Sequence, residues 1–193
     1  MNLVARVKGI LLSPKNEWTV IDGESATVSS LYTGYIVPLA AIPAIAGFIG
    51  LSIFGVGVLG NTFRVPIMRG LSSACVQYVG ALVGVYVLAL IADTLAPNFG
   101  GQKNQIQALK VATYASTASW LSGIFLMLPG LRLLGLLGLY SLYLLFLGLP
   151  ALMKAPEDKA LGYTAVVIIC AVVLAMVVGE ISRLLTGYGG YGY

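Results

Sequence analysis

The chain has 193 residues, of which 59% are hydrophobic and only 9% are charged, and its formal net charge is +4. Soluble domains carry about 25% charged residues, and a water-soluble fold of this size cannot hide so much apolar surface. The composition therefore excludes a water-soluble protein and predicts a polytopic membrane protein whose main solvent is the lipid bilayer. Its positive residues stand singly in short loops without a basic stripe, so nucleic acid is not expected as a partner.

Residues 1–30 are predicted to form a cytosolic or interfacial amphipathic segment, because their apolar residues recur at helical spacing. Pro14 suits the first position of a helix, and Glu17 falls in the first turn, where the helix dipole favours an anion. Trp18 and Ile21 give this helix an apolar side, and tryptophan beside lysine and arginine suits the membrane interface. We therefore expect these four side chains to contact the interface or a partner; a cytosolic helix packed on loops is the alternative.

Five apolar runs follow, and a hydrocarbon core needs only about 20 helical residues to be crossed. Together they predict an all-α transmembrane domain over residues 31–183, a bundle of five helices preceded by the interfacial helix, with a Gly/Tyr tail over 184–193. The first run carries Pro38, Pro43 and two glycines near its end, so we expect a tilted or kinked helix, with unwinding near the glycines left open. The predicted spans cover residues 31–59, 71–91, 106–128, 131–152 and 161–180.

Small residues in two spans predict close helix packing. Gly80 and Gly84 form a Gly-x-x-x-Gly motif, which lets another helix approach the backbone. This motif serves packing within a chain and between chains equally, so self-association stays open. In the third span Ser116, Ser119 and Gly123 make a small-residue surface, which predicts a central place for this span in the bundle.

Polar residues at membrane depth are functional candidates by default. Gln77 is the one strongly polar side chain well inside a predicted span, where it either makes an interhelical contact or lines a hydrated pathway. The ionisable residues cluster at span ends instead. We expect a salt bridge of Asp93 with Lys110 to join the second and third spans, and one of Arg132 with Glu180 to join the fourth and fifth; snorkelling into headgroups is the alternative.

The loop charges predict an orientation, because cytoplasmic loops carry an excess of lysine and arginine. With the N-terminus inside, the inner side holds Arg6, Lys8, Lys15, Lys103, Lys110, Lys154 and Lys159. The outer side then holds Arg64, Arg69, Arg132 and Arg183. Seven positive residues against four favour a cytoplasmic N-terminus and a C-terminus on the opposite face.

The sequence contains no histidine, no paired carboxylates within a span, no nucleophile elbow and no phosphate-cradling glycine loop. Enzymes need such acids, bases, nucleophiles or metal ligands in place. We therefore predict no enzymatic activity, no catalytic residue, no metal and no cofactor.

Several short motifs follow one another along nearly the whole chain. They include Pro14-x-x-Glu17-Trp18-x-Val20-Ile21-x-x-Glu24, Leu39-Ala-Ala-Ile-Pro43, Tyr114-Ala-Ser-Thr-Ala-Ser-Trp120-Leu-Ser-Gly123, Gly138-Leu-Tyr-Ser-Leu-Tyr-Leu-Leu145, Gly148-Leu-Pro150-x-Leu-Met-Lys154 and Lys159-Ala-Leu-Gly-Tyr163. In order and spacing they resemble bacterial inner-membrane members of the Yip family (Ypt/Rab-interacting proteins).

This resemblance implies a five-span bundle in a bacterial inner membrane, with a cytosolic N-terminal segment and a periplasmic C-terminus. Eukaryotic members of the family act in vesicle trafficking and bind Rab-type GTPases. The Asp-Leu-Tyr-Gly-Pro motif associated with those members is absent from this sequence, so a GTPase partner is not carried over.

The leading interpretation is a non-enzymatic, membrane-organising or partner-binding protein whose N-terminal segment engages the cytoplasmic leaflet or an unidentified membrane or cytosolic protein. The alternative is a small transporter or channel for an unidentified solute or ion. That alternative requires a continuous polar cavity near Gln77, Tyr78, Tyr114 or Ser116.

Overall fold

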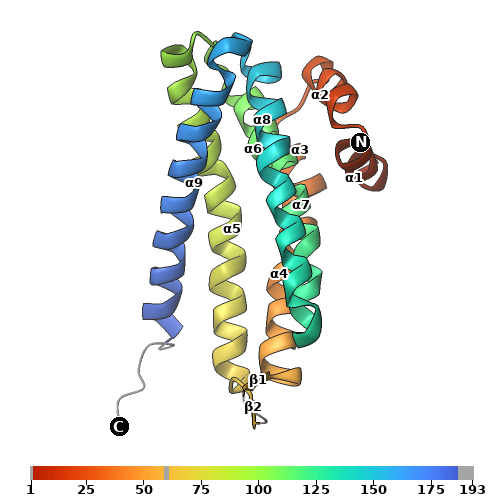
Figure 1. Ribbon diagram of the computed structural model, residues 1–193, viewed down its shortest axis with the longest axis vertical. Helices are drawn as coiled ribbons and strands as arrows, with labels where there is room; N and C mark the ends of the chain where they lie inside the picture. The colour runs from red at the N-terminus through yellow and green to blue at the C-terminus, as the bar shows by residue number, and fades with distance from the viewer. Residues whose placement is uncertain (1, 59–60, 187–193) are drawn as a thin grey trace.

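The computed structural model describes residues 2–58 and 61–186, and its long helices lie side by side as an elongated bundle (Figure 1). Within these residues, four helical stretches are long and apolar enough to cross a membrane. They are Val28–Phe54, Ile67–Phe99, Pro129–Met153 and Glu157–Leu184. The prediction of a helical protein with several membrane-spanning segments is confirmed at this level.

The N-terminal segment forms a helical hairpin of α1 (Leu3–Leu12) and α2 (Pro14–Gly23), which meet at Ser13. The side chain of Asn2 caps α1 by accepting hydrogen bonds from the backbone N–H groups of Val4 and Ala5. Pro14 occupies the first turn of α2, where its missing N–H costs nothing. We call α1 and α2 together the N-terminal hairpin.

The first long stretch is irregular. It consists of α3 (Val28–Leu31), the π-helical η1 (Tyr32–Ile36), α4 (Val37–Phe48) and the π-helical η2 (Ile49–Phe54). Pro43 lies inside α4, and a proline removes a ladder hydrogen bond and distorts a helix.

The predicted extension of this helix to residue 59 is wrong. Gly55 has φ +83°, which ends the helix after Phe54. A short antiparallel pair of strands follows, β1 (Val56–Val58) and β2 (Asn61–Phe63). Unwinding near the two glycines was one possibility for this helix, and the helix does end at the first of them, Gly55.

Two helices are longer than the apolar runs that predicted them. They are α5 (Ile67–Leu95), which continues into the 3₁₀ turn η3 (Ala96–Phe99), and α9 (Glu157–Thr186). A helix satisfies its own backbone groups, so it can continue past the hydrocarbon into the polar zone. Positions 184–186 of the predicted tail belong to α9, and positions 187–193 lie outside the described residues.

The predicted third span is a broken rod instead of a continuous helix. It comprises α6 (Gln105–Ala115), α7 (Thr117–Ser122) and the 3₁₀ segment η4 (Gly123–Met127). At the break, the hydroxyl of Ser116 donates to the carbonyl of Ala112 at 2.7 Å and that of Thr117 to Tyr114 at 2.7 Å, so side chains compete with the helical ladder. A turn at Leu128 then leads to the 3₁₀ segment η5 (Pro129–Leu139) and α8 (Tyr140–Met153).

The broken rod lies in the middle of the protein. α6 packs on both α5 and α8, and every residue from Ala108 to Ala115 is buried. The central place predicted for this segment agrees with that burial. α9 packs on α5 and α8, and α4 packs on α5 and α7.

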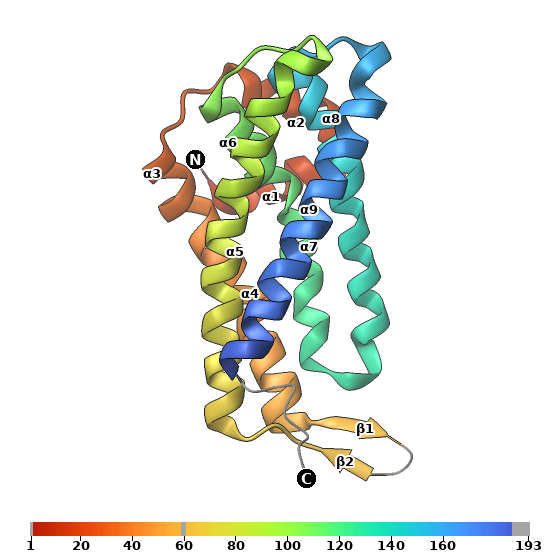
Figure 2. The same ribbon diagram turned by 90° about the vertical axis from the view of Figure 1, so that its left-hand side faces the viewer.

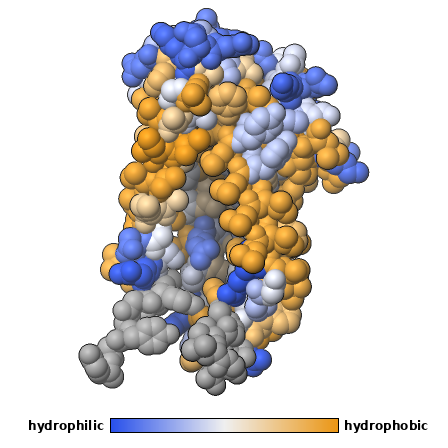
Figure 3. All heavy atoms as spheres, viewed as in Figure 1, coloured by the Kyte–Doolittle hydropathy of each residue, from blue (hydrophilic) through white to orange (hydrophobic). Residues whose placement is uncertain are grey.

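The two ends of the bundle differ (Figure 2). At the upper end of Figure 1 the N-terminal hairpin, residues 100–104 and the connection between α8 and α9 come together. The backbone N–H of Gln102 donates to the carbonyl of Met153 at 2.7 Å there. The pair of strands lies at the opposite, lower end, and a broad apolar belt separates the ends (Figure 3).

Candidate functional site

The N-terminal hairpin is held to the bundle by a buried polar cluster, which we call the docking site. Its central residue is Arg6 of α1, whose side chain is 5% exposed. One guanidinium nitrogen of Arg6 donates to Glu17 of α2 at 2.5 Å, and another donates to both carboxylate oxygens of Glu24. One cation thus joins α1, α2 and the segment that follows them.

The charge of Arg6 is retained despite its burial. Burial alone would lower the pKa of the guanidinium, but the hydrogen bond and negative charge of Glu24, together with smaller contributions that include Glu17, raise the pKa above its ordinary value. Breaking a buried ion pair on one side is costly, because the remaining charge stays uncompensated.

An aromatic group connects this cluster to the membrane bundle. The guanidinium carbon of Arg6 lies 5.5 Å from the ring centroid of Tyr114 on α6, within cation–π range. The Tyr114 ring makes edge-to-face contacts with Tyr35 at 4.9 Å and with Trp18 at 6.4 Å between centroids. The hydroxyls of Tyr35 and Thr117 are 2.8 Å apart and hydrogen-bonded. The hairpin, η1, α6 and α7 therefore meet at one point.

Trp18 is seated against a glycine of α8. The indole is 1% exposed, and a Cβ atom added at Gly148 would lie 2.6 Å from the Cζ2 atom of the Trp18 ring. Any larger residue at position 148 would have to displace a rigid ring, so the close packing of the Trp18 indole on α8 requires glycine at this position.

The C-terminal end of α2 is held by side chains of the bundle. The buried ammonium of Lys110 on α6 donates to the carbonyls of Ile21 at 2.9 Å and Glu24 at 2.5 Å. The amide of Gln107 donates to the backbone and side chain of Asp22 at 3.2 Å and 3.0 Å. The ammonium of Lys154, just after α8, pairs with Asp22 at 2.5 Å. Lys110 and Gln107 thus satisfy carbonyls that a helix end leaves open, and the two lysines place positive charge at the negative pole of the helix dipole.

The structure corrects the predicted place of the α2 residues. Trp18 and Ile21 are buried against the bundle and Glu17 is paired with Arg6, so these side chains do not form an outer contact surface. Pro14 is half-buried in the first turn of α2.

Neither predicted interhelical salt bridge forms among these described residues. Lys110 binds the end of α2 instead of Asp93, and the Oδ1 atom of Asp93 is buried without a hydrogen-bond partner. Glu180 pairs with Arg183 of its own helix at 3.5 Å instead of with Arg132. Residues three positions apart lie on the same face of a helix, which explains why Glu180 pairs with Arg183.

The residues predicted to pack helices make contacts within the chain. A Cβ atom at Gly80 would lie 2.6 Å from Val178 of α9, and one at Gly84 would lie 4.0 Å from Leu174. Similarly, one at Gly123 would lie 2.5 Å from Pro43. The Ser119 hydroxyl donates to the carbonyl of Gly138 at 3.1 Å, whereas the Ser116 hydroxyl stays within its own broken helix. Gln77 donates to Ser73 on α5 at 3.3 Å and so makes no bond to another helix.

Sequence reasoning missed the main residue of the docking site. Arg6 was interpreted only as an orienting loop charge, and Gly148 only as part of a motif. A signal was present, because Glu17, Trp18, Glu24, Tyr114, Gly148 and Lys154 all belong to the quoted motifs. The structure brings these separate motifs together at one site.

The chain is similar to known proteins over nearly its whole length. The Yip1 domain matches residues 8–179. Inner membrane protein YohC of Escherichia coli strain K12 is 29% identical over 191 residues, covering 96% of this chain and 98% of its own length. The protein of the same name from Escherichia coli O6:H1 matches equally, and no solved structure matches the chain significantly. The described residues include several helices long and apolar enough to cross a membrane, and this chain belongs to the Yip1 domain family.

Proposed function

We propose that this protein is a non-enzymatic membrane-organising protein that crosses the inner membrane five times and works through the outer face of its N-terminal hairpin. The observation that carries the proposal is the two-sided character of the hairpin. Its inner face is fixed to the bundle by the docking site, and its outer face presents apolar and cationic side chains together. They are Val4, Lys8, Leu12, Lys15 and Val20.

The outer face has the chemistry of a membrane-surface or partner contact. Val4, Lys8 and Leu12 follow one another every four residues, so they share one side of α1. The side chain of Leu12 is 80% exposed. A helix with an apolar and lysine-bearing face lies in the boundary between headgroups and acyl chains, where anionic lipids attract it. Here the docking site would hold that face at one height beside the bundle.

The ends of the broken rod support the proposed five-span topology. Residues 100–104 lie at the upper end, and the turn at Leu128 lies toward the lower end, so α6, α7 and η4 run from one end to the other (Figure 2). The positive residues support a cytoplasmic upper end, since seven of them belong to it and four to the lower end. A cysteine placed at Lys103 should react with an impermeant thiol reagent only from the cytoplasmic side, and one at Arg132 only from the periplasmic side. Opposite labelling would reverse the orientation.

The outer face can be tested without disturbing the docking site. The variant Leu12→Ser/Val20→Ser should lose protein or lipid neighbours that are recovered from native membranes by brief crosslinking and mass spectrometry. Thermal unfolding should be unchanged, because both side chains are exposed. A matched variant with exposed apolar residues on α5, Val79→Ser/Val83→Ser, should keep those neighbours. If the hairpin variant keeps the same neighbours as the unmodified chain, the proposal fails.

The alternative function, a small transporter or channel, required a continuous polar cavity. Tyr114 is instead buried in the docking site, and the Tyr78 hydroxyl donates to the carbonyl of Val37 at 3.1 Å. Gln77 and Ser116 do line a common cleft, but alanine, glycine, valine and leucine make up most of its wall. We therefore do not propose transport.

A further inference from the structure

A cleft of about 630 Å³ opens on the side of the bundle away from the N-terminal hairpin, between α5 and α9 on one side and α4 and α7 on the other. The space-filling view shows this face hollowed between its apolar walls (Figure 3). Sites that bury most of a small ligand occupy about 300–1,000 Å³. The cleft lies within the apolar belt, so whatever fills it comes from the bilayer.

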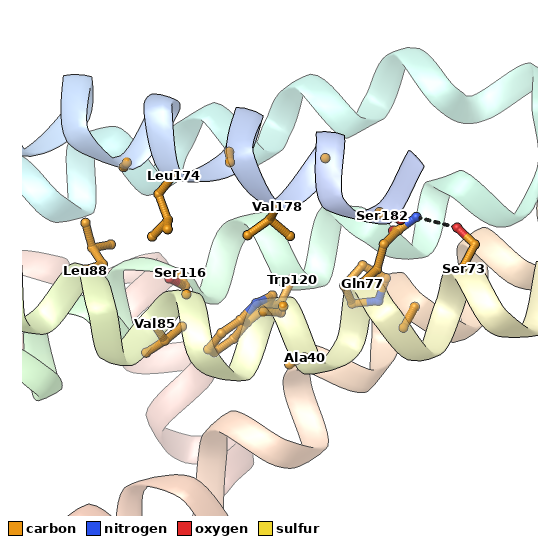
Figure 4. A pocket seen from close by; sticks show the side chains of 18 of the residues that line it. Ala40, Ser73, Gln77, Val85, Leu88, Ser116, Trp120, Leu174, Val178 and Ser182 are labelled. Atoms are coloured by element: carbon orange, nitrogen blue, oxygen red, sulfur yellow. Dashed lines mark hydrogen bonds between the residues drawn. The ribbon is translucent and has the colours of Figure 1, made fainter. Parts of the chain in front are cut away.

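Small residues on two helices contribute to this space. Gly80, Ala81 and Gly84 of α5 line it together with Ala171 and Ala175 of α9. The side chains that project into the cleft are mainly aliphatic, as Figure 4 shows for Val85, Leu174 and Val178. The flat side of Trp120 contributes to the inner wall. The middle of the cleft is thus suited to a hydrocarbon chain.

The lower end of the cleft has a different chemistry. Ser73 and Gln77 of α5 lie there with Ser182 of α9 (Figure 4). Arg183 of α9 also lines the cleft. Gln77 is 16 residues before Asp93, about 24 Å along the helix. With Asp93 at the upper edge of a hydrocarbon core of about 30 Å, Gln77 lies about 6 Å from its lower edge. The polar end therefore lies near the headgroups of the lower leaflet, and the apolar part extends toward the bilayer centre.

The charges at the lower end favour a negatively charged ligand. Arg64, Arg69, Arg132 and Arg183 lie in this part of the described chain, against the single carboxylate of Glu180. Glu180 contacts only the Nε atom of Arg183, at 3.5 Å, and both side chains are well exposed. An exposed pair of this kind binds weakly, and a guanidinium has four further N–H donors that can hold phosphate oxygens.

We propose that this cleft binds an anionic phospholipid of the lower leaflet, with one acyl chain between the packed α5–α9 pair and α4 and α7, and its phosphate at Arg183 and Gln77. The order of polar end and apolar depth matches that of a phospholipid, and the excess of arginine matches a negative headgroup. The amide of Gln77 then faces the headgroup region instead of hydrocarbon, which accounts for an exposed glutamine within a span. The site is independent of the proposed role of the N-terminal hairpin, which lies at the other end of the bundle.

The test uses the full chain in proteoliposomes that contain a photoreactive acyl-chain analogue of phosphatidylglycerol, with labelled peptides mapped by mass spectrometry. Labelling should fall on residues 73–88 and 171–183. Unlabelled phosphatidylglycerol should compete at least about tenfold better than phosphatidylethanolamine, because both carry the phosphate but only phosphatidylethanolamine adds an ammonium that the arginines at this end would repel. Arg183→Gln should abolish this preference, and the matched control Arg132→Gln should keep it because Arg132 does not line the cleft.

A second pair of variants tests the acyl chain. Ala175→Phe places a ring in the cleft and should remove the labelling, whereas Val177→Phe, on an exposed position of the same helix outside the lining, should leave it unchanged. Equal competition by the two phospholipids would overturn the proposal and identify ordinary surrounding lipid. Labelling that survives Ala175→Phe, or crosslinks between copies of the chain at α5 and α9, would overturn it too.

Discussion

The upper and lower ends of this bundle use charge in opposite ways. At the upper end Arg6 and Lys110 are buried, and the carbonyls and carboxylates that they contact belong to α2 and to Glu24 directly after it. At the lower end Glu180 and Arg183 are more than half exposed and pair only within their own helix. Buried charges with several hydrogen bonds hold the helices in one arrangement, whereas exposed charges in a single weak pair remain available to bind ligands.

The first and last long stretches also differ in burial. In the most apolar window of Val28–Phe54, 39% of residues are buried, but only 17% are buried in that of Glu157–Leu184. The first stretch is therefore covered mainly by protein, and the last depends on lipid for more of its packing. The comparison predicts that substitutions at the docking site act on stability, and substitutions in the cleft act on lipid binding.

The largest loss of docking is expected for Trp18→Ala, because it removes a fully buried indole and leaves a cavity. The free energy of docking should fall by about 3–5 kcal/mol, measured by hydrogen exchange of the α1 and α2 amides. The control Val20→Ala, on the exposed side of α2, should change it by less than about 0.5 kcal/mol. Equal effects of both substitutions would contradict the buried position of Trp18.

Arg6→Met should come next, since it leaves Glu17 and Glu24 without their common cation. We expect a loss of about 3 kcal/mol, typical of removing one partner from a buried ion pair. The rate of amide hydrogen exchange should rise in α1 and α2 but not in α9. A double-mutant cycle with Glu17→Gln should show strong non-additivity, and simple additivity would mean that the pair does not couple the two helices.

A smaller effect is expected for Gly148→Ala. The added Cβ atom would lie 2.6 Å from the Trp18 ring, and such overpacking costs about 1–3 kcal/mol. Gly47→Ala serves as the control, because nothing lies within 4 Å of a Cβ atom there and alanine favours a helix. Thermal unfolding in detergent should separate the two; an unchanged unfolding temperature for Gly148→Ala would contradict the tight seat.

Lys154→Gln should have the smallest effect on docking. Its ion pair with Asp22 is partly exposed, with 49% of the lysine side chain accessible. Such pairs contribute about 0–1 kcal/mol, and less at high salt. Hydrogen exchange of α2 at low and high ionic strength measures this term, and a loss as large as that for Arg6→Met would place the main contact of the hairpin at Asp22 instead.

Much of the fold could be predicted from the sequence, because apolar length and proline or glycine breaks are local signals. The predicted runs correspond to α4, α5, α8, α9 and the broken rod, although their ends are displaced. The break at Ser116 depends on hydroxyl groups that bond to their own backbone, and small residues alone did not indicate it.

The docking site was less accessible to prediction, since its contacts join distant parts of the chain. The interface prediction for Trp18 relied on composition, which describes equally well a tryptophan at a lipid surface and one in a core. Burial became apparent only when Gly148 and Tyr114 were placed beside it. Lys110 was likewise assigned to Asp93 because that carboxylate was the nearest in the predicted topology, whereas the carbonyls of Ile21 and Glu24 carry no signal in a sequence.

The docking site also has a consequence for the order of events during biosynthesis. The hydroxyl of Tyr140 donates to the carbonyl of Leu11 across 129 positions, and Lys154 pairs with Asp22 across 132. At a synthesis rate of about 5–20 residues per second, the hairpin waits roughly 7–26 s before its last partners exist. During that time Arg6 can already pair with Glu17 and Glu24, but the Trp18 indole has no Gly148 to pack against. The N-terminal hairpin is thus synthesised well before it can reach its final place, and a chain arrested before residue 148 would leave the indole without that contact.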